Sequence, residues 1–277
     1  MPVPPKFNEE FLQWFRAKTE MSWRQLPPRR MGDFLAELKQ EEEETGLGSA
    51  YRSDGGWHPA WRSAKWLNSL TDEEINTVEE QWHLRFPADY RLFYKMLHST
   101  DRPGFVPSGD ELDDEYPWPY TGLFYNWQKN PTGIQQAYEH ILGGFAFDAI
   151  YNNERFWHPE WGEKPLTEEE AHERLKPILD AAPRLIPLAD HAYLLAEPCQ
   201  AGNPVLSIWQ SDIIVSAPDL RTYLLGSFGN LRNDLSHSLL QLSNRDRKRV
   251  NKEIKSLMDK KEHEYQAIPF WGDYLFF

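Results

Sequence analysis

The stretch that constrains the fold most runs from residue 185 to residue 216. It contains three short runs rich in β-favouring residues, and the segment 197–204 between the first two carries Pro, Gly and Asn. Such runs separated by turn residues are typical of consecutive strands in one sheet. We therefore expect the centre of the fold to be a sheet with strands over 193–196, 205–209 and 212–216.

In the sequence before and after this stretch, apolar and aromatic residues recur at helical spacing. Phe7, Phe11, Trp14 and Phe15, for example, fall at intervals that place them on one face of a helix. By the same criterion we expect helices over 7–20, 31–44, 70–82, 87–97, 132–142, 167–176, 220–228 and within 231–261.

Two of these helices begin with the same capping signature. Thr71 is followed three residues later by Glu74, and Thr167 by Glu170. A threonine and a glutamate at this spacing can satisfy the free N–H groups of the first turn reciprocally, so each pair predicts a helix start.

Gly and Pro suggest where two helices end. Gly143 and Gly144 are expected to stop the helix that begins near residue 132, leaving 145–151 as a further strand. Pro177 is expected to end or kink the helix that Thr167 begins, because proline lacks the N–H that an interior position donates.

Segment composition suggests three parts. Residues 45–56 contain four glycines and are the best linker candidate. We expect a helical amino-terminal extension and linker over 1–56, a central domain over 57–230, and a basic helical extension over 231–277.

Charge and cysteine content narrow the class of protein. The net charge of −13 opposes phosphate binding, so we expect no nucleic-acid partner. The single cysteine, Cys199, rules out an internal disulfide and a Cys-rich zinc site and fits a reducing compartment. We find no signal peptide and no apolar run of about 18 residues, and so expect a cytoplasmic protein without membrane contact.

Catalytic motifs were sought and none is present. The chain has no HExxH, no GxSxG and no P-loop, and Gly46-Leu47-Gly48 lacks the third glycine of a dinucleotide loop. We therefore expect no catalytic residue, no bound metal and no cofactor.

A Trp-His-Pro string occurs twice, at residues 57–59 and 157–159, and each is followed by a further tryptophan. One interpretation is similar turn packing at both places. The other is a shared aromatic pocket, for a small ligand or for metal-dependent hydrolysis. The residues of that pocket would be Trp57, His58, Trp61, Trp157, His158, Trp161 and His191.

The segment 110–120 is the most acidic and aromatic stretch. It is either a solvated loop, a partner-binding surface or, least favoured, a catalytic pair of carboxylates, because such a cluster repels itself and attracts cations. Its partner-binding residues would be Asp110, Glu111, Asp113, Asp114, Glu115, Tyr116, Trp118 and Tyr120. The basic segment 245–261 is either a solvated helix face or a second contact surface.

Residues 70–97 also carry a family resemblance. Here a capped helix, a short turn that ends in an apolar residue and Pro, and an Asp-Tyr start to an aromatic helix follow one another. This pattern resembles the start of SMI1/KNR4 domains, also called the SUKH superfamily. The matching residues are Leu70, Ile75, Glu79, Phe86, Pro87, Asp89 and Tyr90. The later segments 185–187, 203–205, 212–214 and 220–228 are similar to that family's strands and closing helix.

The resemblance covers residues 70–228 and implies a noncatalytic, protein-binding α+β domain in which helices pack on a mixed, mostly antiparallel sheet. Bacterial members of that family are commonly immunity proteins that neutralise toxins, and fungal members regulate cell-wall synthesis. By this resemblance we expect an immunity or antitoxin-type protein whose partner is a toxin domain, with an intracellular regulatory scaffold as the alternative. Because an acidic inhibitor suits a basic toxin active site, we expect the contact at residues 110–120.

Overall fold

The computed structural model describes residues 2–25, 40, 64–101, 124–152, 156–189, 191–229, 231 and 239–275. In chain order the described helices are α1 (Glu9–Gln25), α3 (Asp72–Gln81), α4 (Ala88–Met96), α5 (Pro131–Phe147), the π-helix η3 (Asp148–Asn152), the 3-10 helix η4 (Pro159–Trp161), α6 (Glu168–Ala181), α7 (Leu220–Gly229), α8 (Asn244–Gln266) and the 3-10 helix η6 (Trp271–Tyr274). The strands are β1 (Leu185–Ala189), β2 (Ala192–Leu195), β3 (Val205–Trp209) and β4 (Asp212–Ala217).

The sheet forms within the stretch that the sequence singles out. Its order is β1-β2-β3-β4, and every neighbouring pair is antiparallel. Ile186 lies opposite Leu194, and Leu206 lies opposite Val215. The one parallel pairing among the described residues is an isolated bridge between Ile213 and Leu275. The α+β class is confirmed, with a sheet that is an antiparallel meander.

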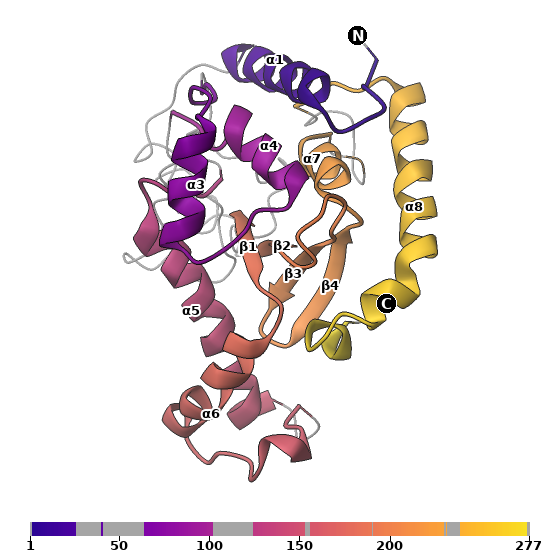
Figure 1. Ribbon diagram of the computed structural model, residues 1–277. Helices are drawn as coiled ribbons and strands as arrows, with labels where there is room; N and C mark the ends of the chain where they lie inside the picture. Colours follow the sequence, from indigo (N-terminus) through magenta and orange to yellow (C-terminus); the bar gives the residue numbers. More distant parts are fainter. Residues whose placement is uncertain are drawn as a thin grey trace.

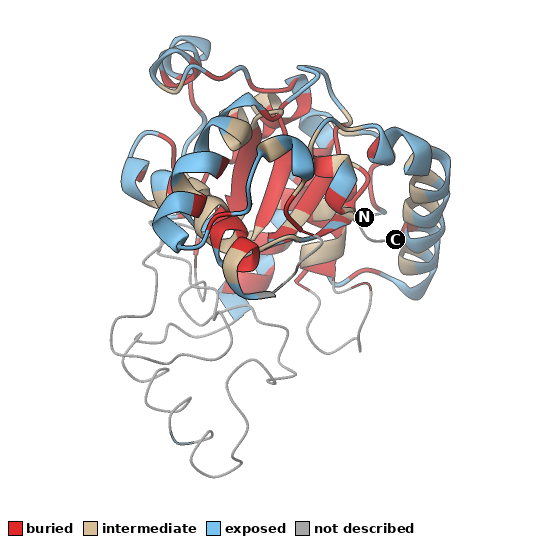
Figure 2. Cartoon of the chain, turned by 90° about the horizontal axis from the view of Figure 1, so that it is seen from below, coloured by how far each residue is buried: buried red, intermediate tan, exposed pale blue. Residues whose placement is uncertain are grey.

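Helices enclose this sheet (Figure 1), with α5 beside β1 and β3, α7 beside β4, and α8 along the edge next to β4. Figure 2 shows buried strands surrounded by helices with exposed outer faces. The amino-terminal helix shares this core, because the Phe15 ring lies 4.8 Å from Phe228 and 5.9 Å from Trp66. The described parts of the two extensions therefore pack on the central domain.

The expected cap of α3 is present, with the Thr71 hydroxyl accepting a hydrogen bond from Glu74 N and the Glu74 carboxylate accepting one from Thr71 N at 2.7 Å. Glu79 is buried and accepts a hydrogen bond of 2.7 Å from Phe86 N, while its other carboxylate oxygen pairs with Arg91 at 2.7 Å. The polar residues of this segment therefore hold the α3–α4 pair together.

The expected end of α5 at Gly143 and Gly144 was wrong. Helix α5 continues to Phe147 and passes directly into η3, so 145–151 is helical and not a strand. Position 144 has no room for a side chain, because a Cβ on Gly144 would lie 2.9 Å from Gln210 Cα in the β3–β4 turn. Gly144 thus allows helix and turn to approach closely, instead of ending the helix.

Of the two outcomes expected at Pro177, an end of the helix does not occur, because α6 runs through this residue to Ala181. Pro177 is exposed, so water can satisfy the carbonyl that loses its helical N–H partner. The helix expected over 31–44, apart from residue 40, and the linker expected over 45–56 lie outside the described residues. In the part of the chain that is described, no helix combines the length and the apolar character needed to cross a bilayer.

Candidate functional site

The second Trp-His-Pro string forms a packed aromatic cluster. The Trp161 ring lies 5.2 Å from Trp157 and 4.8 Å from His158, and the His158 ring lies 5.7 Å from Tyr274. Trp157 is buried and donates a hydrogen bond of 3.0 Å to Gly162 O. These contacts join the η4 turn to the carboxyl-terminal segment, which is a packing role.

His191 makes its ring contact with a different group. It lies 6.1 Å from Trp209, and His140 of α5 contacts the same tryptophan at 5.6 Å. Trp57, His58 and Trp61 lie outside the described residues, as do all the residues of the acidic segment 110–120. Among the sites proposed from the sequence, the structure therefore brings together only Trp157, His158 and Trp161.

No group of three or more His, Cys, Asp or Glu side chains within the described ranges is arranged to hold a metal ion. Cys199 is exposed, and its thiol lies 3.5 Å from Phe86 O in hydrogen-bonding geometry.

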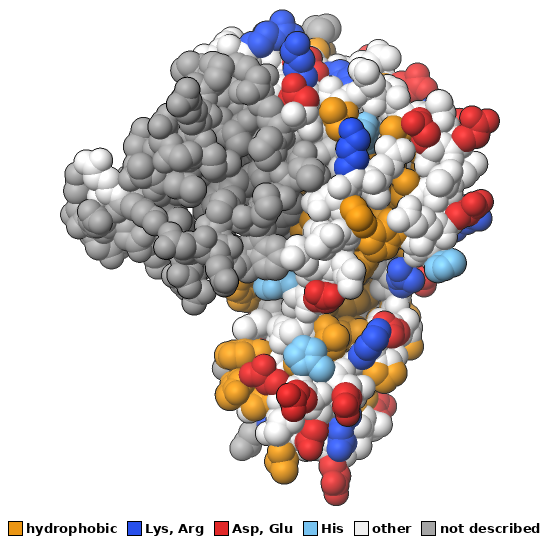
Figure 3. Space-filling model, turned by 90° about the vertical axis from the view of Figure 1, so that its left-hand side faces the viewer, with side chains coloured by type: hydrophobic (Ala, Val, Ile, Leu, Met, Phe, Trp, Pro, Cys, Tyr) orange, Lys and Arg blue, Asp and Glu red, His pale blue; other side chains and the backbone are white. Residues whose placement is uncertain are grey.

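A second surface lies at the end of the molecule formed by α6 and the segments before it. Figure 3 shows acidic and hydrophobic side chains together on this lower part. Leu166 is 85% exposed, Tyr151 61% and Phe147 39%. Between residues 163 and 173 there are five glutamates and one lysine. We call this surface the acidic lobe; it consists of Phe147, Tyr151, Leu166, Glu168, Glu169, Glu170 and Glu173.

Contacts between η3 and α6 hold the acidic lobe together. The Phe147 and Tyr151 rings are 4.9 Å apart, and Tyr151 is hydrogen-bonded to Glu168. That bond to a carboxylate is the main cause that raises the pKa of Tyr151. At the base of the lobe the buried Asp148 carboxylate accepts hydrogen bonds from Ser211 N at 2.8 Å and from its hydroxyl at 2.5 Å. The exposed hydrophobic residues thus stand on an anchored element.

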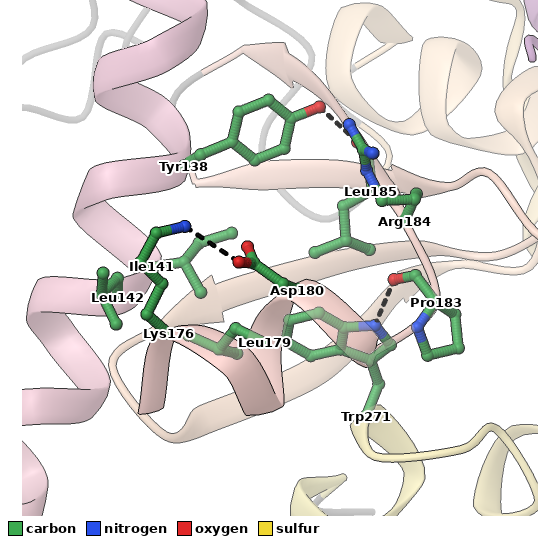
Figure 4. Close-up of a pocket in the computed structure, with 10 residues that line it drawn as sticks. All are labelled: Tyr138, Ile141, Leu142, Lys176, Leu179, Asp180, Pro183, Arg184, Leu185 and Trp271. Carbon is green, nitrogen blue, oxygen red and sulfur yellow. Dashed lines mark hydrogen bonds and ion pairs between the residues drawn. The ribbon is translucent and has the colours of Figure 1, made fainter. Parts of the chain in front are cut away.

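A cavity of about 330 Å³ lies between α5, α6 and the start of β1 (Figure 4). Its volume is at the lower end of the range of about 300–1,000 Å³ for small-ligand sites. The lining is mostly apolar, with charged side chains at Lys176, Asp180 and Arg184. Lys176 and Asp180 form an exposed ion pair at 2.9 Å. The apolar residues of the lining are Tyr138, Ile141, Leu142, Leu179, Pro183, Leu185 and Trp271.

Two hydrogen bonds fix the shape of this cavity. The Tyr138 hydroxyl donates to Leu185 O at 2.7 Å and also interacts with the Arg184 guanidinium, as Figure 4 shows. Trp271 Nε1 donates to Pro183 O at 2.8 Å. Burial raises the pKa of Tyr138 to about 12, so its hydroxyl stays protonated at neutral pH and keeps donating. The Arg184 guanidinium is thereby held against the Tyr138 side chain.

Neither the acidic lobe nor this cavity was anticipated from the sequence. The sequence indicates only a helix start at the glutamates after Thr167, and it predicts a strand over 145–151, where the structure has helix. The available signal was the isolated apolar Leu166 directly before an acidic first turn.

Comparisons with protein-family models, with curated proteins and with solved structures found no match. The assignment of function therefore depends on the geometry described above and on the resemblance of residues 70–228.

Proposed function

We propose that this chain is a noncatalytic binding protein of the SMI1/KNR4 type, which neutralises a toxin domain by direct contact in the manner of an immunity protein. The observation that carries the proposal is the acidic lobe, where exposed hydrophobic side chains stand beside a run of glutamates. Clustered exposed apolar residues mark interaction surfaces. The surrounding negative charge favours a basic partner, such as a domain that degrades nucleic acid.

The arrangement of the elements supports the class. The resemblance leads us to expect α3, α4, the strands and α7 in this order, which the chain follows with α5 and α6 placed before the strands. In this framework Glu79 and Asp89 are engaged in bonds to backbone N–H groups of neighbouring segments. Residues of the motif thus maintain the scaffold and leave recognition to surfaces around the sheet.

The test is co-expression with the product of the gene that adjoins this one in its native genome. The complete chain should protect cells from that product and form a complex with it. Leu166→Asp, and separately the pair Glu169→Lys with Glu173→Lys, should each weaken the complex by roughly tenfold or more, because a central apolar anchor and complementary charge are both lost.

Matched variants control for surface change alone. Met21→Asp changes another exposed apolar residue, on α1, and the pair Glu80→Lys with Glu139→Lys produces the same change in net charge away from the lobe. These variants should bind as the unchanged chain does. Protection that survives the lobe variants, or that the control variants abolish equally, would contradict the placement on the acidic lobe.

A second candidate function is small-ligand binding in the cavity between α5 and α6. The specific observation is Arg184, which Tyr138 contacts at the edge of an apolar space. This combination suits a flat organic anion, because the carboxylate can pair with the guanidinium while the ring packs on Trp271. Titration with 2-naphthoate should show saturable binding that Arg184→Gln abolishes and Lys164→Gln leaves intact; equal binding by both variants would reject this site.

A further inference from the structure

The charged side chains of α8 differ in their exposure to solvent according to their sign. Between residues 244 and 256 every exposed side chain is either cationic or neutral, in a chain whose net charge is −13. The neutral ones are Asn244, Asn251 and Ser256. We call the cationic set the basic face; it consists of Arg245, Lys248, Arg249, Lys252 and Lys255.

The two acidic residues in this part of α8 are half-buried and already paired. Asp246 caps the helix start through Ser243 and pairs with Arg249 at 3.1 Å. Glu253 pairs with the buried Arg221 at 2.7 Å. Neither carboxylate is therefore available to neutralise Lys248 or the cations that follow it.

The position of α8 leaves the basic face exposed to solvent. Helix α8 lies along the edge of the molecule, with its inner side on α7 and β4 (Figure 1). Figure 2 shows an exposed outer side and a half-buried inner side. Arg245 and Lys255 are ten residues apart, so the basic face extends for about 15 Å at a rise of about 1.5 Å per residue.

At its amino-terminal end the basic face reaches a surface hollow of about 780 Å³ between α1 and α8. Lys18 of α1 adds a further cation there, next to Arg245 and Arg249. The one carboxylate in the lining is Asp246, which is occupied by Ser243 and Arg249. The remaining lining residues are Pro2, Gln241, Leu242 and Ser243.

We propose that the basic face and this hollow bind an acidic segment of a partner protein. Charge complementarity is the argument: a short run of Asp and Glu side chains can pair with successive cations along the helix and end in the hollow. Exposed side chains of the basic face are all polar, so the contact is of the electrostatic kind and distinct from the apolar contact proposed for the acidic lobe.

The same features disfavour nucleic acid. No aromatic side chain is exposed between residues 244 and 256, so bases have nothing to stack on there. A long phosphate polymer would also extend past the basic face onto the rest of the molecule. Without the cations of the basic face, the charge of the chain is even more negative than the net −13, so this part would repel phosphate. A short acidic segment stays within about one Debye length, roughly 8 Å at physiological salt, of the cations it contacts.

The experiment uses the full chain and a fluorescein-labelled oligoglutamate peptide, followed by fluorescence anisotropy at low and at physiological salt. Saturable binding that weakens with added salt is expected. The pair Lys248→Glu with Lys252→Glu should weaken it by about tenfold or more, since two exposed pairs become repulsive. The pair Lys129→Glu with Lys164→Glu, which changes two exposed lysines elsewhere by the same charge, should have little effect.

Circular dichroism and thermal melts establish that both variants fold. Absence of peptide binding at low salt, or equal loss in the two variants, would overturn the proposal. Duplex DNA of matched charge binding as tightly as the peptide would overturn the choice of an acidic protein segment. Concentration-dependent dimerisation that only the Lys248/Lys252 variant abolishes would reassign the face to a second copy of this chain.

Discussion

The Asp89 carboxylate accepts a hydrogen bond of 2.8 Å from the backbone N–H of Gly202, and so joins the start of α4 to the loop between β2 and β3. The same loop is held from its other side, because Lys261 of α8 donates to Gly202 O at 2.6 Å. Gly202 has a φ of +93°, a region that side chains other than glycine rarely adopt. Gly202 thus connects α4 with α8 through its two backbone hydrogen bonds.

Asp89→Ala should lower the free energy of unfolding by about 1–3 kcal/mol, because it removes a buried carboxylate and leaves the half-buried Gly202 N–H without its acceptor. Urea unfolding followed by circular dichroism measures this. Asp101→Ala is the control: it removes an exposed carboxylate that accepts from Lys65 N at 2.8 Å, and water can replace that acceptor. Equal losses in the two variants would contradict the role of burial.

The contribution of Asp89 should also depend on pH. Burial, which outweighs the hydrogen bonds from Gly202 and Tyr90, raises the pKa of Asp89 above its usual 3.8. The folded state therefore holds this proton more tightly than the unfolded state does. The stability advantage over Asp89→Ala should be largest below pH 3.8 and should shrink as the pH rises through the raised pKa; an advantage that grows over this window would refute the assignment.

His98 should produce the opposite trend. Burial lowers the pKa of His98 below its usual 6.5, although its Nε2 lies 2.8 Å from Asn68 O. Protons then bind preferentially to the unfolded state, so stability is full above pH 6.5 and is lost as the pH falls through the lowered pKa. His98→Asn should flatten this dependence in unfolding curves recorded over that range, whereas His83→Asn, at an exposed position, should preserve it.

Gly143 and Gly144 offer a matched pair within one helix. Gly143→Ala places a methyl group in open space and should stabilise the protein by up to about 1 kcal/mol through helix propensity. Gly144→Ala forces a methyl group against Gln210 Cα and should cost about 1–3 kcal/mol. Thermal melts of the two variants should shift in opposite directions, and a parallel shift would show that the helix can move away from the turn.

Glu79→Gln tests the framework of α3 and α4. The neutral amide keeps one oxygen for Phe86 N but loses the charge that pairs with Arg91, so we expect a loss of about 1–3 kcal/mol. Glu80→Gln changes a neighbouring exposed residue and should alter stability by less than about 0.5 kcal/mol. Chemical unfolding of both variants measures the two losses of stability. A loss at Glu79 no larger than that at Glu80 would show that the Glu79–Arg91 pair contributes no more than an exposed ion pair does.

Local pattern alone was enough for much of the fold. Alternation and turn residues located β2, β3 and β4, and the Thr71–Glu74 pair located the start of α3 to the residue. These features are decided by neighbours close in the chain, namely β-propensity, turn chemistry and satisfaction of the first-turn N–H groups. The α+β class was what the resemblance of residues 70–228 implied, and the structure confirms it.

Other features depended on contacts between distant segments, which no local pattern contains. Gly144 looked like a helix stop, yet α5 continues because Gln210 of the β3–β4 turn needs the space that its missing Cβ leaves. The same continuation carries Phe147 and Tyr151 onto the acidic lobe beside Leu166. The sequence by itself determined which segments become helix and strand; only the tertiary structure decided which faces stay exposed, because burial and charge pairing are set by residues far apart in the chain.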